Sequence, residues 1–151
     1  MNVDTAIYIE LRVVDFGVIV PNDLGMCICA CAKNTAAYFD PFTTELAAIR
    51  EGLLFAKEYG LQISLVESDC LNTIQAINST LGYSSDELIV KDVVSLLHDK
   101  DIVSLLHDVG GGSCDFVPRD GIRLPTHWLS FVSLLVVIHL FLRKFYCYSC
   151  S

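Results

Sequence analysis

The change from strand-like to helix-like patterning near residue 40 constrains the fold of this chain more than any other feature. Residues 2–20 and 25–33 are rich in β-branched, aromatic and other strand-forming residues. Turn-prone Asp15 divides the first segment, and residues 21–25 (PNDLG) separate it from the second. Apolar runs bounded by turn signals predict strands joined by tight turns. We therefore expect a three-strand antiparallel meander at the start of the chain.

The next segment carries helix signals at both ends. Asp40 suits an N-cap, Pro41 suits the first helical position, and Gly60 suits the left-handed position that follows a helix. Between these residues, apolar side chains recur at helical spacing: Leu46, Ile49, Leu53 and Ala56. One stripe of this helix is therefore expected to face the core.

Strands and helices then alternate. Residues 61–69 (LQISLVESD) form a short apolar run ending in acids, which indicates a buried strand with an exposed C-terminal end. Asp69 can cap a following helix, whose apolar residues recur every three positions: Leu71, Ile74 and Ile77. Residues 86–97 predict a further helix, and residues 114–117 a last short strand. This order predicts an α/β fold with a mixed five-stranded sheet flanked by helices.

A tandem duplication interrupts the second half of the chain. Residues 91–99 (KDVVSLLHD) are followed directly by 100–108 (KDIVSLLHD), with a single Val-to-Ile difference. In one continuous helix, the apolar face of the second copy would turn by about half a turn relative to the first. A break near residues 99–101 would relieve this conflict, and the glycines at 110–112 give a flexible exit.

The chain has the length and composition of one domain, with an unusually apolar end. Apolar residues make up 53% of the 151 residues and charged residues 19%, which excludes a disordered chain. The run 128–142 (WLSFVSLLVVIHLFL) contains no carboxylate and no permanent cation, but it is shorter than the about 20 residues that span a bilayer. A core helix, an interfacial anchor and a C-terminal tail anchor remain open, and membrane association through 128–142 is the weaker alternative.

The N-terminus predicts an intracellular protein, nuclear or cytoplasmic, and the cysteines fit this prediction only as thiols. The first residues lack a basic region followed by an apolar stretch, so we expect no secretory signal. In a reducing compartment the seven cysteines are thiols, and Cys27, Cys29 and Cys31 would face one side of a strand as small apolar residues. Cys147 and Cys150 form a lone CxxC without a second ligand pair nearby, which argues against a zinc site.

The net charge of −8 argues against tight, nonspecific nucleic-acid binding, because phosphate backbones favour clustered Lys and Arg. Carboxylates that hold divalent cations are an exception, since bound cations reverse the local field that a phosphate meets. Three acids stand where strands and helices are expected to begin or end: Asp4, Glu45 and Asp69.

The motifs around these acids resemble those of the plant-type ribonuclease H-like domain family, the reverse-transcriptase-associated branch of type 1 ribonuclease H. Family members typically read NVDGA, GxGVVIRDxxG, AExxALREGLxxA, VESDS, QAIN and VPRxxNRxAHxLA. This chain reads NVDTA, FGVIVPNDLG, TELAAIREGLLFA, VESDC, QAIN and FVPRDGIRLPTHWLS in the same order. The resemblance covers residues 1 to about 130 and implies a ribonuclease H-like fold over residues 1–128, with 129–151 as a tail that is atypical of the family.

The resemblance also implies an activity. Asp4, Glu45 and Asp69 would hold two Mg²⁺ (or Mn²⁺) ions, and the substrate would be the RNA strand of an RNA–DNA hybrid, recognised through its 2′-hydroxyl groups. The expected enzyme is a hydrolase that acts as an endonuclease. Each acid also has a structural alternative, with Asp69 as a helix cap, Glu45 as an acid favoured by the helix dipole, and Asp4 as a solvated residue.

Three positions depart from the family pattern. His127 is the candidate for the fourth catalytic position, but its spacing is one residue too long, and Pro125 suits only the first turn of a helix. Ile122 stands where the family has Asn, and Thr5 stands where it has Gly, so the Thr5 side chain could hinder the approach of a substrate. These departures favour a second hypothesis, a catalytically impaired nucleic-acid-binding module. A third is a truncated, membrane-associated fragment.

Overall fold

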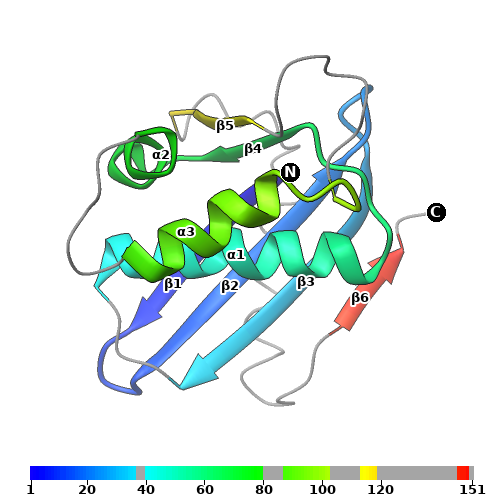
Figure 1. The fold of residues 1–151 in the computed structure, drawn as a ribbon. Helices are drawn as coiled ribbons and strands as arrows, with labels where there is room; N and C mark the ends of the chain where they lie inside the picture. Colours follow the sequence, from blue (N-terminus) through cyan, green and yellow to red (C-terminus); the bar gives the residue numbers. More distant parts are fainter. Residues whose placement is uncertain (37–39, 80–86, 103–112, 119–145, 150–151) are drawn as a thin grey trace.

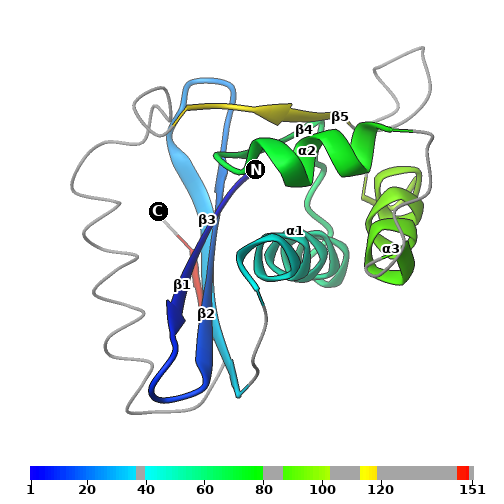
Figure 2. The same cartoon turned by 90° about the vertical axis from the view of Figure 1, so that its left-hand side faces the viewer.

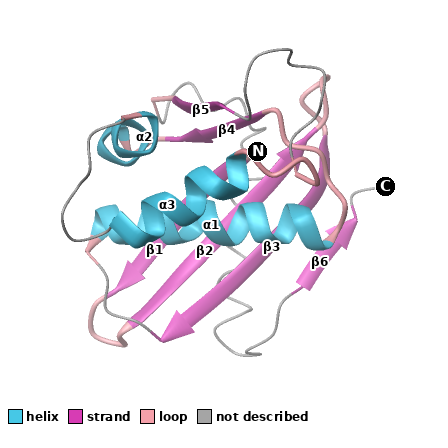
Figure 3. Cartoon of the chain, viewed as in Figure 1, coloured by secondary structure: helices cyan, strands magenta, loops and turns pink. Residues whose placement is uncertain are grey.

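A single mixed sheet with helices packed on it forms the molecule (Figures 1 and 3). The computed structural model describes residues 1–36, 40–79, 87–102, 113–118 and 146–149. Its strands are β1 (Asn2–Tyr8), β2 (Val13–Pro21), β3 (Cys27–Ala36), β4 (Leu65–Ser68), β5 (Ser113–Phe116) and β6 (Tyr146–Ser149). Its helices are α1 (Pro41–Glu58), α2 (Leu71–Asn78) and α3 (Glu87–Leu97).

The sheet has the order β5-β4-β1-β2-β3-β6. Strands β1, β2 and β3 form the expected antiparallel meander, while β4 pairs parallel with β1 and β5 pairs parallel with β4. The predicted mixed five-stranded sheet is therefore confirmed. The structure adds β6, from the C-terminal tail, which pairs antiparallel with β3 and places Cys31 opposite Cys147 in register.

The first hairpin turns at a different place from the predicted one. Asp15 lies inside β2, opposite Ala6 of β1, and its side chain is buried. The chain reverses instead between Tyr8 and Val13, where Arg12 adopts the left-handed conformation with φ of 51°. The prediction of a turn at Asp15 was therefore wrong, because the pairing of two apolar strands outweighs the turn preference of one residue.

The second hairpin turns where the sequence predicts. Oδ1 of Asn22 accepts hydrogen bonds from the main-chain N–H groups of Leu24 (3.0 Å) and Met26 (2.9 Å). Gly25 takes a φ of 77°, which a residue with a side chain rarely adopts. An Asn side chain that bonds its own turn and a left-handed glycine together fix this reversal.

Helix α1 begins and ends at the predicted residues. The Asp40 carboxylate accepts from the main-chain N–H groups of Phe42 (3.0 Å) and Thr43 (3.1 Å), and Gly60 follows the helix with a φ of 63°. The predicted apolar stripe is confirmed, because all four of its residues are fully buried: Leu46, Ile49, Leu53 and Ala56. Gly52 lets the helix lie close to the sheet, since a Cβ there would stand 3.2 Å from Val18 of β2.

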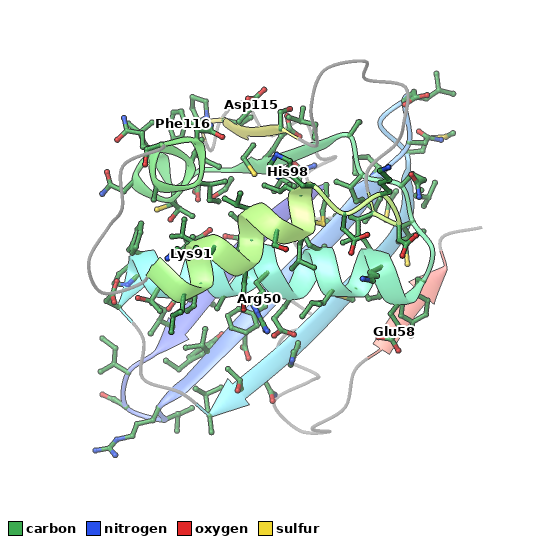
Figure 4. The ribbon with its side chains drawn as sticks, viewed as in Figure 1. Arg50, Glu58, Lys91, His98, Asp115 and Phe116 are labelled. Carbon is green, nitrogen blue, oxygen red and sulfur yellow. The ribbon has the colours of Figure 1, made fainter. Side chains whose placement is uncertain are left out.

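Helix α1 lies between the sheet and α3 (Figure 2). Two ion pairs join α1 to the α3 segment, from Arg50 Nε to Asp92 Oδ2 at 3.1 Å and from Lys57 Nζ to Asp99 Oδ2 at 2.6 Å. Arg50 and Lys57 are seven residues apart, and their partners follow in the same order at the same separation. The two segments therefore run in the same direction. Figure 4 shows Arg50 on α1 close to α3.

The two copies of the duplicated segment have different structures. Most of the first copy forms α3, with Val93 fully buried, and the helix ends at Leu97. The second copy starts as a turn, in which the N–H of Ile102 donates to the carbonyl of Asp99 at 3.0 Å. Ile102, the counterpart of Val93, is fully buried, and its carbonyl accepts from the N–H of Ile63 at 2.7 Å. The predicted break near 99–101 is confirmed.

The cysteines of β3 pack as predicted for thiols on one face of a strand. Cys29 and Cys31 belong to the buried core under α1, and Cys27 is half-buried. The apolar run 128–142 and the residue Cys150 lie outside the described residues. Within the described part of the chain, none of the helices is both long and apolar enough to cross a bilayer.

Candidate functional site

The parallel pairing of β1 with β4 brings two of the predicted acids together. Asn2 of β1 stands opposite Glu67 of β4 in register. Two residues further along each segment come Asp4, within β1, and Asp69, just past the end of β4. Asp4 is exposed and Asp69 is half-buried, where β4 ends and α2 begins. Two of the predicted acids therefore lie on adjacent segments, one within β1 and one just past the end of β4.

The third acid, Glu45, reaches this place from the first turns of α1. Its Oε1 accepts a hydrogen bond from Thr5 Oγ1 of β1 at 2.5 Å, and its Oε2 accepts from Ser68 Oγ of β4 at 3.1 Å. Glu45 is 7% exposed, and Ser68 is fully buried. Two strands thus hold one buried carboxylate of α1: β1, which carries Asp4, and β4, which Asp69 follows directly.

The electrostatics of Glu45 show that the three acids interact. Burial raises the pKa of Glu45, and the charges of Asp69 and Asp4 raise it further. The hydrogen bonds from Thr5 and Ser68 act in the opposite direction, because they stabilise the charged carboxylate. The site therefore concentrates negative charge that a bound cation would compensate.

The structure contradicts two of the structural alternatives, namely Asp69 as a helix cap and Glu45 as an acid favoured by the helix dipole. The N-cap of α2 is Cys70 rather than Asp69, and α2 has no side-chain capping hydrogen bond. Glu45 is not a surface acid of the helix start, since Asp40 caps α1 and the Glu45 side chain is buried. Asp4 is exposed, as its structural alternative expects, but it also acts on the pKa of Glu45.

Oxygen ligands of this kind suit a hard divalent cation. Carboxylates on separate elements are the ligands with which Mg²⁺ is bound in proteins, together with several waters. In the part of the chain that the structure describes, no group of three His, Cys, Asp or Glu side chains is arranged closely enough to hold a metal ion by itself. The donor set of Asp4, Glu45 and Asp69 therefore matches such a cation in chemistry and charge, while the structure does not gather the three side chains into one metal-binding group.

The remaining predicted site residue, His127, lies outside the described residues, as do Ile122 and Pro125. Sequence reasoning assigned no role to Ser68 and treated Thr5 only as an obstacle. Both donate to Glu45 in the structure. The sequence contained a signal for Ser68. Successive side chains of a strand point to opposite faces, so the residue before Asp69 was expected to point the other way, towards the core. No local pattern marks Thr5, whose partner is 40 residues away.

The antiparallel meander, the parallel strands β4 and β5 and the acids at the end of β4 define a ribonuclease H fold. Solved structures with this fold support the assignment. Ribonuclease H1 of Halobacterium salinarum matches with a TM-score of 0.60 and 15% identity, over 79% of this chain and 84% of that one. LC11 ribonuclease H1, in complex with an RNA/DNA hybrid, matches with a TM-score of 0.65 and 10% identity, over 92% and 96%.

The N-terminal ribonuclease H domain of a Mycobacterium tuberculosis protein matches similarly, with a TM-score of 0.60 and 12% identity, over 88% of this chain and 94% of that one. The chain belongs to the reverse transcriptase-like family, whose family model matches residues 2–108. The comparison with curated proteins gave no significant match. The family resemblance of the motifs is confirmed by these findings.

Proposed function

We propose that this chain binds RNA–DNA hybrids and cleaves their RNA strand as a divalent-cation-dependent endonuclease. The observation that carries this proposal is the position of Glu45, a buried carboxylate of α1 that accepts hydrogen bonds from Thr5, next to Asp4, and from Ser68, next to Asp69. Membership of the reverse transcriptase-like family supports a nucleic-acid substrate. So does the similarity of the fold to a ribonuclease H1 that was solved with an RNA/DNA hybrid.

Asp4, Glu45 and Asp69 are the residues that would hold Mg²⁺ or Mn²⁺. When bound there, the cations would activate a water for attack on phosphorus and would stabilise the negative charge on the leaving 3′ oxygen. The role of the protein is to keep three carboxylates charged and oriented at the end of β4. Thr5 and Ser68 contribute by donating hydrogen bonds to the charged form of Glu45. His127 is proposed as the fourth residue of the site.

The test is cleavage of a hybrid with a labelled RNA strand. We expect cleavage in Mg²⁺, none after chelation with EDTA, and loss of cleavage in Asp69→Asn. Single-stranded RNA and DNA duplex of the same sequence serve as substrate controls. Asp92→Asn is the matched protein control, because the Asp92 carboxylate pairs with Arg50 on the α1–α3 surface. Mg²⁺-independent cleavage, or full activity in Asp69→Asn, would contradict the proposal.

A second candidate is a module that binds hybrids without cutting them. The observation that favours it is that, among the described residues, no three His, Cys, Asp or Glu side chains are grouped so that they could hold a metal ion. The net charge of −8 also limits affinity for phosphate backbones in the absence of cations. Binding of a labelled hybrid in Mg²⁺ without any cleavage would identify this second function.

A further inference from the structure

Thr5 connects two of the acids of the site. Its hydroxyl donates to Oε1 of Glu45 at 2.5 Å, and its main-chain N–H donates to Oδ1 of Asp4 at 2.9 Å. The first bond joins β1 to α1 across 40 residues of sequence. A single residue thus contacts a buried acid on the helix and an exposed acid on its own strand.

The hydroxyl from Thr5 works together with the one from Ser68. Each of the two Glu45 oxygens accepts one hydroxyl, from opposite neighbours on β1 and β4. The last torsion of a glutamate side chain is broad, so its carboxylate rotates easily when nothing holds it. Two donors from two strands fix the plane of this carboxylate. An ionised carboxylate has about four acceptor sites, so two hydroxyls leave about two for a cation and its waters.

We propose that Thr5 is a positioning residue, whose hydroxyl holds the Glu45 carboxylate in the orientation in which it binds a divalent cation. This inference rests on the proposed function, since it assigns Glu45 to the cation. Its physical basis is preorganisation: a ligand that is already held in place loses little conformational freedom when the ion binds. Without the hydroxyl, Glu45 would have to be ordered by the ion itself.

Two variants of Thr5 separate the hydroxyl from the rest of the side chain. Thr5→Val removes the hydroxyl and keeps the branched shape, while Thr5→Ser keeps the hydroxyl and removes the methyl group. Thr5→Ala provides a second hydroxyl-free variant in case Thr5→Val does not fold. Circular dichroism and thermal unfolding establish that each variant is folded before its cation binding is measured.

The experiment is a calorimetric titration of the metal-free protein with Mn²⁺, repeated with Mg²⁺. We expect Thr5→Val and Thr5→Ala to bind the cation about tenfold more weakly, as a hydrogen bond to a charged group predicts. Thr5→Ser should stay within about twofold of the unaltered chain. In the hybrid cleavage assay, the Mg²⁺ concentration at half-maximal rate should rise by the same factor, with little change of the rate at saturating Mg²⁺.

Different results overturn the two proposals. Equal cation affinity in Thr5→Val and the unaltered chain would refute the positioning role, and so would equal losses in Thr5→Ser and Thr5→Val, which would assign the effect to packing. A chain that binds no divalent cation also overturns it. If the cation binds and Thr5→Val weakens it, but no hybrid is cleaved, the positioning role stands and the proposed endonuclease activity fails.

Discussion

The hydroxyl of Ser68 in β4 donates a hydrogen bond of 3.1 Å to Oε2 of Glu45 in α1, and both side chains are buried. This bond joins the first turns of α1 to the last residue of β4, directly before Asp69. A buried carboxylate oxygen that loses its donor keeps the full cost of its desolvation. The site and the stability of the fold therefore depend on the same pair of residues.

Removing the Ser68 hydroxyl should destabilise the protein. We expect Ser68→Ala to lower the free energy of unfolding by about 1–3 kcal/mol, the cost of an unsatisfied buried group. Urea unfolding of Ser68→Ala, Glu45→Ala and the double variant measures the coupling between the two side chains. A coupling energy near zero would show that the bond contributes nothing to stability.

Mg²⁺ should stabilise the folded chain through the acids of the site. At a Mg²⁺ concentration of about 100 times its Kd, linkage raises the free energy of unfolding by about 2.7 kcal/mol. In Asp69→Asn most of this gain should disappear. Without Mg²⁺ the pKa of Glu45 should fall towards its ordinary value in that variant, because the charge of Asp69 raises it. Thermal unfolding with Mg²⁺ and with EDTA tests the gain, and equal stabilisation of Asp69→Asn would contradict it.

Asp15 should make the protein less stable as the pH rises. Burial raises the pKa of Asp15 from 3.8 to about 6, and neither of its carboxylate oxygens has a hydrogen-bond partner. The folded state therefore holds this proton more tightly than the unfolded state. The free energy of unfolding should fall by on the order of 3 kcal/mol as the pH rises from about 4 to above 6.

The measurement is urea unfolding at pH 4, 5, 6 and 7.5. Asp15→Asn cannot ionise, so its stability should lack this part of the pH dependence, and above pH 6 it should exceed that of the unaltered chain. Asp23→Asn, in the exposed turn between β2 and β3, is the matched control and should retain the full fall. The same pH dependence in Asp15→Asn and the unaltered chain would refute the assignment to Asp15.

Ile102 should contribute far more to stability than its position in a repeated segment suggests. Because it is fully buried, we expect Ile102→Ala to cost about 2–5 kcal/mol and Ile102→Val about 0.5–1.5 kcal/mol. Leu88→Ala on α3 is the control, since Leu88 is 79% exposed and its truncation should change stability by less than about 0.5 kcal/mol. Urea unfolding of the three variants measures these differences. Similar small losses in all three would mean that Ile102 is not part of the core.

The sequence alone predicted the elements whose signals are local. The cap at Asp40, the glycine at Gly60 and the Asn22 turn depend on neighbours within a few residues, and the structure has each of them in place. The family motifs also singled out Asp4, Glu45 and Asp69 as candidate metal ligands, because the spacing of motifs along a chain is visible without coordinates, and this role stays a prediction. The role of His127 stays a prediction.

Tertiary structure decided what local signals could not. Nearly identical copies, 91–99 and 100–108, begin as a helix and as a turn, and in the turn the carbonyl of Ile102 accepts a hydrogen bond from the distant Ile63. Asp15 lies in a strand because β1 and β3 pair on either side of it. The hydrogen bond from Thr5 to Glu45 joins residues 40 positions apart, so it exists only after α1 has packed on β1. Contacts between distant residues follow from the packing of whole elements, and no short stretch of sequence specifies them.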